Sequence, residues 1–303
     1  MSYASFAAVP GVGRSVLAAL LLAPLLWHGA PCPARTTAEA QSPESAADAP
    51  ALSAPLPNTD GSGLLARPPP FNALEQARIF AEGQVACALS CVTKYGTVLG
   101  AADGTTGLSN CASPCIRPNS AYLDLDTGEV SLQAPNTNPN PKQPNLRYSG
   151  IAYQCVEYAR RWWMKNLGLA FGDVDRAIDI IYLTQAEQLG GSGSIALARS
   201  VNATAQRPPR RGDLIVYYQD RDNPDWKFGH VAVVVGVDLD QGIVSVAEQN
   251  YSNAPWQDAE HYARRIRLFE IGGRYTLVDV PITSVRNPEG GRVAGWVYPL
   301  SAR

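Results

Sequence analysis

The residues of this sequence best suited to chemistry are one cysteine, one histidine and one glutamate. Cys155 opens a predicted helix, where unpaired backbone N–H groups and the positive end of the helix dipole favour the thiolate. His230 precedes the apolar run 231–237, and Glu248 follows the apolar run 243–247. A thiolate, an imidazole and a carboxylate supply a nucleophile, a general base and a group that orients the base. These are the parts of a cysteine hydrolase.

A predicted hairpin brings His230 and Glu248 together. Residues 238–242 join the two apolar runs, and a turn centre near Leu239 puts His230 directly opposite Glu248. Cross-strand neighbours on one face lie roughly 5 Å apart at Cβ, within hydrogen-bonding reach of an imidazole and a carboxylate. A slip of one residue would put Gln249 opposite His230 and turn Glu248 to the other face.

The predicted helix also offers hydrogen-bond donors for a reacting carbonyl group. The backbone N–H groups at its start can hold the oxyanion that forms when the Cys155 thiolate attacks, and Gln154 can add a side-chain donor. Each residue alone has an ordinary alternative, because most single cysteines are buried and inert. That alternative requires three unrelated accidents at compatible positions, so the sequence favours a catalytic interpretation.

Helical and strand patterns surround these residues. Apolar residues recur at helical spacing from Cys155 to Leu167, and Gly168 can end that helix. Weaker helical patterns cover 72–88 and 174–189. Strand patterns cover the segments 94–100, 214–218, 231–237, 243–247, 275–278 and 293–297. Helices first and antiparallel strands afterwards predict an α+β fold.

The composition predicts a globular domain behind a flexible segment. The chain has 303 residues, is 46% hydrophobic and carries a formal net charge of -2, so it can bury a core. It has no long run of Lys or Arg, which argues against nucleic-acid binding. We expect a single domain at 71–303 with a core at about 94–299. Residues 41–70, rich in Ala, Pro and Ser, are expected to form a disordered linker.

The first forty residues have the features of a secretory signal peptide. Arg14 precedes the apolar run 16–27, which is shorter than the roughly 20 residues that a membrane span needs. Ala38 and Ala40 offer small residues for cleavage, so residues 1–40 are expected to be removed and to leave no stable membrane span. An uncleaved signal anchor is the alternative. The expected location is therefore the secretory-pathway lumen or the outside of the cell.

Four further cysteines lie close together in the expected mature chain: Cys87, Cys91, Cys111 and Cys115. In an oxidising compartment they can form two disulfides, with the connectivity left open, and Cys155 remains as the odd thiol. A structural zinc site built from the two cysteine pairs is the alternative, but the predicted leader favours disulfides. We expect no metal ion and no cofactor.

Several segments resemble the CHAP family of papain-like amidases. They are 154–161 (QCVEYARR), 211–215 (RGDLI), 229–234 (GHVAVV) and 247–250 (AEQN). Within that family, the sequence is most similar to the amidase domain of bifunctional glutathionylspermidine synthetase/amidase and of trypanothione synthetase. Residues 95–100 (YGTVLG) resemble the start of that domain, and 295–297 (GWV) resemble its end.

The resemblance implies a papain-like fold of the CHAP/NlpC-P60 type, with N-terminal helices packed on an antiparallel β-sheet. It implies that Cys155 is the nucleophile, His230 the general base and Glu248 the third member of the site. The residues that it implies on the substrate side are Arg160, Gln249 and Asn250.

The expected function is that of a secreted cysteine amidohydrolase that cleaves an amide bond through a thioester. Given the leader, the expected substrate is a peptidoglycan peptide, for example one with a D-alanyl-glycyl bond. One alternative, implied by the resemblance, is an amidase that releases a polyamine from a glutathionylspermidine or trypanothione type of conjugate. The other alternative is a non-catalytic module that binds the cell wall. The sequence leaves the oligomeric state open.

Overall fold

A computed structural model of the chain describes residues 66–134, 145–279 and 291–300. All of these residues belong to one unit, Pro55–Arg303. The predicted signal peptide and the predicted linker up to residue 65 lie outside the described residues. In the part that is described, no helix is both long and apolar enough to cross a membrane.

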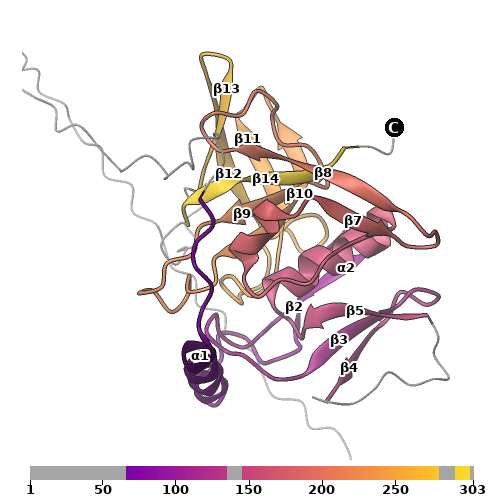
Figure 1. The fold of residues 1–303 in the computed structure, drawn as a ribbon, viewed down its shortest axis with the longest axis vertical. Helices are drawn as coiled ribbons and strands as arrows, with labels where there is room; N and C mark the ends of the chain where they lie inside the picture. Colours follow the sequence, from indigo (N-terminus) through magenta and orange to yellow (C-terminus); the bar gives the residue numbers. More distant parts are fainter. Residues whose placement is uncertain (1–65, 135–144, 280–290, 301–303) are drawn as a thin grey trace, which may run out of the picture. The chain divides into compact units, whose positions relative to one another are not determined.

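A large antiparallel sheet forms the centre of the fold (Figure 1). Among the described residues it has nine strands, in the order β13-β12-β11-β10-β9-β14-β8-β7-β6. Their bounds are β6 Leu169–Phe171, β7 Gln185–Gln188, β8 Ser194–Val201, β9 Leu214–Tyr217, β10 His230–Asp238, β11 Ile243–Ala247, β12 Arg264–Ile271, β13 Arg274–Val278 and β14 Val293–Pro299. The strands predicted at 214–218, 231–237, 243–247, 275–278 and 293–297 all belong to this sheet.

Two smaller sheets lie in the N-terminal half of the unit. One pairs β1 (Val98–Ala102) with β2 (Thr105–Leu108). The other has the order β4-β3-β5, with β3 at Ser120–Asp124, β4 at Val130–Gln133 and β5 at Leu146–Ile151. The chain leaves β5 and enters the helix α2 within four residues, so the small sheet positions the start of that helix.

Helix α2 (Cys155–Leu167) packs on the large sheet, as predicted for this segment. Its aromatic residues Trp162 and Trp163 are buried in one core cluster with alternate residues of β10. The indole Nε1 of Trp163 donates to the carbonyl of Gly212, 2.8 Å away, at the start of the β9 segment. Gly168 ends the helix with φ 65°, a left-handed conformation that glycine adopts without strain.

The prediction that N-terminal helices pack on the sheet is wrong. Helix α1 (Ala73–Ala86) begins with a capping box formed by Asn72 and Glu75, but few of its apolar residues are buried. Its Ile79 packs with Phe71 and Ile116 in a small separate cluster, and Figure 1 shows α1 set apart from the large sheet. Among the residues that the structure describes, five strands lie between α1 and α2, so the order of helices first and strands afterwards does not hold.

The helix predicted at 174–189 is also replaced by other structure. The chain forms a short 3-10 helix at Ala177–Tyr182 and then enters β7. Nearly every residue of the 3-10 helix is buried, so its apolar residues follow one another without a helical period. A continuous apolar run of this kind does not distinguish a helix from other buried structure.

Two disulfides, Cys87–Cys115 and Cys91–Cys111, confirm the prediction and supply the connectivity. They join the C-terminal end of α1 to the segment between β2 and β3. In the described part of the chain, Cys155 is the free cysteine. The thiol that opens α2 is thus separate from the cross-links that hold α1.

Removing one disulfide should destabilise the fold. Cys87 and Cys115 are 28 residues apart, and a cross-link of that span stabilises a protein by about 3 kcal/mol through the unfolded state. We expect the double variant Cys87→Ser/Cys115→Ser to lose stability on this scale in urea unfolding without reductant. The pair Cys91→Ser/Cys111→Ser, with a span of 20 residues, should lose slightly less. Unfolding midpoints equal to the wild type would contradict this expectation.

Candidate active site

Cys155 lies on the wall of a cavity of about 320 Å³. Its neighbours Gln154, His230 and Asn250 line the same cavity. Cys155 as a whole residue is 8% exposed, and it is among the residues that line the cavity. Of the residues that the sequence singled out, these four are therefore brought together.

The chain makes a tight approach into Cys155. Tyr153 has φ 62°, a left-handed conformation that is unfavourable for a residue with a side chain. Gly150 has φ 145°, and a Cβ there would lie 3.0 Å from the Cα atom of Glu157. Glycine is thus required where β5 passes the first turn of α2. Gln154, in an extended conformation, then precedes the helix.

His230 and Glu248 form the predicted contact. The Nε2 atom of His230 lies 2.8 Å from Oε2 of Glu248, and both side chains are almost fully buried. Gly229, before the histidine, has φ 72°, and a Cβ there would lie 2.6 Å from the carbonyl oxygen of Tyr217. The backbone therefore admits His230 to this position only because glycine precedes it.

The register of the hairpin differs from the prediction by two residues. Val233 pairs with Ala247, whereas the predicted register would pair it with Ser245. Because side chains alternate with a period of two, a shift of two keeps His230 and Glu248 on the same face. The predicted contact thus forms although the register is wrong, with Glu248 one residue beyond the end of β11.

A bulge in β10 determines that His230 and Glu248 lie on the same face. The register shifts between Val234 and Gly236, so β10 carries one extra residue relative to β11. Continued without the bulge, the pairing near the turn would put Gln249 and Ala247 on the face of His230. The bulge puts Glu248 on that face instead of those residues, which makes the contact possible. The sequence does not reveal the bulge.

Arg264 holds the other side of the Glu248 carboxylate. Its Nε atom donates to Glu248 Oε1 at 2.5 Å, and its Nη2 atom donates to the hydroxyl of Tyr217 at 3.1 Å. The guanidinium also forms a buried ion pair with Asp279 and stacks 3.9 Å above the ring of Tyr251. Positive and negative groups therefore alternate from His230 through Glu248 to Asp279.

These charges set the protonation states of the site. Burial alone would lower the pKa of His230, but the adjacent Cys155 thiolate, a hydrogen bond with Cys155, and Glu248 raise it from 6.5 to about 9. Burial alone would raise the pKa of Glu248, but the charges of Arg264 and His230 lower it from 4.5 to about 2. Since Nε2 of His230 contacts Glu248, Nδ1 is the ring nitrogen left to contact Cys155.

Two of the expected substrate-side residues lie elsewhere. The guanidinium of Arg160 donates to the carbonyls of Ser149, Phe171 and Gly172, and the residue does not line the cavity with Cys155. Gln249 is 1% exposed and points into the polar network beneath the first turn of α2. Both side chains support neighbouring segments, whereas Gln154 and Asn250 face the cavity.

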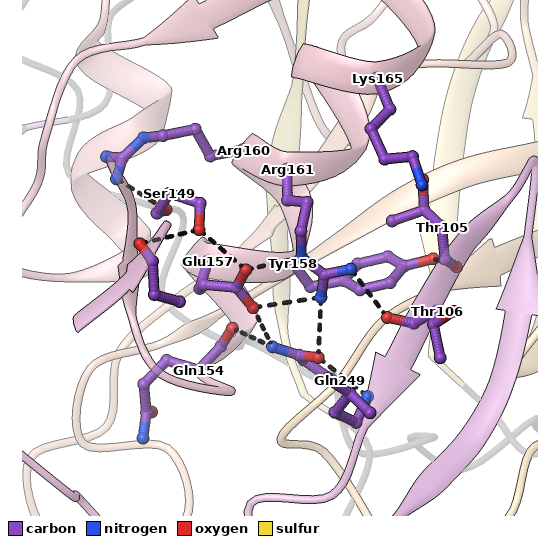
Figure 2. Close-up of polar contacts among 12 residues, drawn as sticks. Thr105, Thr106, Ser149, Gln154, Glu157, Tyr158, Arg160, Arg161, Lys165 and Gln249 are labelled. Carbon is purple, nitrogen blue, oxygen red and sulfur yellow. Dashed lines mark hydrogen bonds and ion pairs between the residues drawn. The ribbon is translucent and has the colours of Figure 1, made fainter. Parts of the chain in front are cut away.

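Figure 2 shows that network, which is centred on Glu157. This carboxylate is fully buried, and it accepts hydrogen bonds from Ser149 Oγ at 3.0 Å, Arg161 Nε at 2.6 Å and Gln249 Nε2 at 2.6 Å. Arg161 also donates to the carbonyl of Thr106 in β2, at 2.9 Å. One buried charge thus joins β5, α2, β2 and the segment that follows β11.

Sequence reasoning missed several of these supporting residues. Glu157 and Arg161 stand four apart on a predicted helix, a spacing that indicates an ion pair and was a usable signal. Arg264 and Asp279 gave no comparable signal, because they are far apart in the chain and neither lies in a recognisable motif.

Comparison with known families confirms the predicted resemblance. The CHAP domain matches residues 146–250 of this chain. The matched segment begins in β5 and ends just after β11, so it includes Cys155, His230 and Glu248 together with Gln154 and Asn250.

Among curated proteins, the chain is 29% identical over 185 residues to the bifunctional glutathionylspermidine synthetase/amidase of Escherichia coli (strain K12), covering 61% of this chain and 27% of that protein. It is 30% identical over 132 residues to trypanothione synthetase of Crithidia fasciculata, covering 44% and 19% respectively. The chain thus spans about a quarter or less of these relatives. The crystal structure of Ly7917 aligns with 48% of this chain and 53% of its own at 16% identity, with a TM-score of only 0.25.

Removing the cation beside Glu157 should strongly destabilise the protein. Arg161→Met leaves a buried carboxylate without its ion pair, and we expect a loss of about 3–5 kcal/mol in the free energy of unfolding. The matched control is Arg78→Met on α1, because Arg78 and Glu82 form an i,i+4 pair that is mostly exposed. That control should cost at most about 1 kcal/mol. Urea unfolding measures both, and similar losses would contradict a special role for the Glu157 network.

Proposed function

We propose that this chain, which carries a CHAP domain, is a cysteine-dependent amidase with a papain-like arrangement of its site. The observation that carries the proposal is the chain of contacts from Cys155 through His230 to Glu248, in which Cys155 and His230 line one cavity and Glu248 is buried behind them. A raised pKa at His230 and a lowered pKa at Glu248 favour an ion pair between thiolate and imidazolium. That pair is the reactive form of a cysteine nucleophile.

In the proposed reaction, Cys155 Sγ attacks the carbonyl carbon of an amide and forms a carbon–sulfur bond. Gln154 donates a hydrogen bond to the oxyanion of the tetrahedral intermediate. His230 gives its proton to the departing amine as the carbon–nitrogen bond breaks, which leaves a thioester. Neutral His230 then takes a proton from water, whose oxygen attacks the thioester carbon. The carbon–sulfur bond breaks, the acid leaves, and the Cys155 thiolate and the His230 imidazolium are restored. Glu248 holds the imidazole in the required orientation throughout.

A peptide amide of bacterial peptidoglycan is the first proposed substrate class. The predicted leader supports it, and the two disulfides are compatible with an oxidising location outside the cytosol. A secreted amidase meets wall peptides there, including those with D-alanyl-glycyl bonds.

A polyamine conjugate is the second candidate. It is supported by the names of the relatives and by carboxylates in the lining of the cavity, namely Glu82, Asp173, Asp175 and Asp225. Within the described part of the chain, Asp175 and Asp225 have no ion-pair partner, so their charges are available to a cationic leaving group. A non-catalytic wall-binding module is less favoured, because binding alone does not require a thiol, an imidazole and a carboxylate in contact.

The variant Cys155→Ala should abolish turnover while leaving the fold intact. The wild type and this variant would be incubated with glutathionylspermidine and, separately, with peptidoglycan peptides, and the products read by mass spectrometry. Spermidine released by the wild type alone identifies a polyamine-conjugate amidase, and cleaved wall peptides identify an endopeptidase. Iodoacetamide should label Cys155 because the other described cysteines are in disulfides. Turnover by Cys155→Ala at the wild-type rate would refute the proposal.

Activity should fall as the pH rises through about 9. The pKa of His230 is raised above its ordinary value, so the ring is protonated at neutral pH and loses its proton near that value. The variant Glu248→Gln lacks one of the charges that stabilise protonated His230. Its activity should therefore fall at a pH closer to neutral than the activity of the wild type. The rate of turnover measured from pH 5 to pH 10.5 checks both statements, with circular dichroism to exclude unfolding. An alkaline limb unaffected by Glu248→Gln would exclude this role of the carboxylate.

A further inference from the structure

Three side-chain amides and one backbone carbonyl form a closed ring of hydrogen bonds beside Cys155. Asn110, which is fully buried, donates from Nδ2 to the carbonyl of Cys115 at 2.5 Å and to Oδ1 of Asn250 at 3.0 Å. Asn250 donates from Nδ2 to Oε1 of Gln154 at 2.7 Å. Gln154 donates from Nε2 to the same Cys115 carbonyl at 3.0 Å, which closes the ring.

The Cys115 carbonyl gives this ring a fixed direction. An isolated amide can reverse its oxygen and nitrogen, but a backbone carbonyl can only accept a hydrogen bond. The carbonyl therefore requires the nitrogen of Asn110, whose donation requires the oxygen of Asn250. The nitrogen of Asn250 then faces Gln154, and because it is a donor, the oxygen of Gln154 must face it. Reversing any one amide would set two acceptors or two donors against each other.

The fixed direction matters for the hydrogens of Gln154. Its Nε2 atom carries two hydrogens, and one of them is used by Cys115. Among the described residues, the other hydrogen has no acceptor, so it can bind a ligand in the cavity that Gln154 and Cys155 both line. With the amide reversed, Gln154 would present its oxygen to the developing oxyanion, and the partial negative charge of that oxygen would repel the oxyanion.

Asn110 itself is held rigidly. Its backbone N–H donates to Oδ1 of Asn253 at 2.8 Å, and the next residue, Cys111, is in the Cys91–Cys111 disulfide. In the described residues, the Oδ1 atom of Asn110 has no hydrogen-bond partner, so its side chain acts here through the donor nitrogen. Asn110 lies outside the segment that matches the CHAP domain, 146–250, so this support is an addition to that segment.

We propose that Asn110 is a positioning residue, which acts through Asn250 to keep the amide of Gln154 turned with its N–H toward the reacting carbonyl. The inference rests on the proposed function. It extends that function by assigning a role in oxyanion stabilisation to the disulfide-linked segment between β2 and β3.

The test uses two probes of Cys155 that differ in one respect. The Cys155 thiolate adds to the carbonyl carbon of N-acetylglycinal and forms a carbon–sulfur bond. The former carbonyl oxygen of this adduct lies where the oxyanion of the reaction forms, and it accepts the hydrogen bond from Gln154. Iodoacetamide alkylates the thiolate and releases iodide, without forming an oxyanion. Protection of Cys155 from iodoacetamide by increasing N-acetylglycinal gives the affinity for the aldehyde, and it requires no knowledge of the natural substrate.

We expect Asn110→Ala to weaken aldehyde binding by roughly tenfold or more, while the alkylation rate stays within about twofold of the wild type. Gln154→Ala should weaken it by about 100-fold, and adding Asn110→Ala to that variant should have little further effect. Asn110→Leu, which keeps a similar size but lacks the donor, should resemble Asn110→Ala. The rate of turnover should fall in the same proportion, with little change in KM.

Asn202→Ala is the matched structural control. Asn202 also uses both ends of its amide, on the backbone N–H and carbonyl of Leu277, but it is not among the residues that line the cavity. Its variant should leave aldehyde binding unchanged. Equal aldehyde affinities in the wild type and Asn110→Ala would overturn the inference, as would additive effects of Asn110→Ala and Gln154→Ala. A wild type that binds no aldehyde and turns over no amide would instead refute the proposed function.

Discussion

The buried carboxylate of Glu157 is the interaction on which the geometry of the site most depends. Its partners come from β5, from α2 and from the segment after β11, so one charge draws three parts of the chain to one point. Leaving such a charge unpaired costs several kcal/mol, and the protein can avoid that cost only by keeping all three parts in register. Cys155 lies two residues before Glu157, and Glu248 lies one residue before Gln249. The network therefore fixes the distance between the thiol and the carboxylate that serves His230.

A second charged chain lies on the far side of the histidine. Arg264 neutralises both Glu248 and Asp279, and its contact with Tyr217 links it to the strand beside β10. Because Glu248 stays ionised, His230 can remain protonated in a buried position where an isolated imidazolium would be unstable. The aromatic rings around His230 keep water away from this pair, which strengthens its electrostatic attraction.

The sequence predicted local features well and long-range geometry less well. Helix α2 and its end at Gly168 follow from spacing and a glycine, and both are confirmed. The contact of His230 and Glu248 was also predicted, although from a register that was wrong by two residues. The contact forms all the same, because a shift of two residues keeps each side chain on its face of the sheet. The pairing of the four cysteines and the inward direction of Arg160 depend on contacts between distant segments. No local pattern encodes such contacts, and a consecutive apolar run such as 177–182 does not identify its own secondary structure.

The bulge between Val234 and Gly236 restricts how this hairpin can change in length. The turn 239–242 can absorb one added or lost residue by changing its own length, which leaves the pairs on both strands as they are. One residue added to or removed from a strand, between the bulge and the site, instead reverses the face on which His230 or Glu248 lies unless the bulge changes as well. Variation in length is therefore confined to the turn, and the strands on either side of it keep a fixed length.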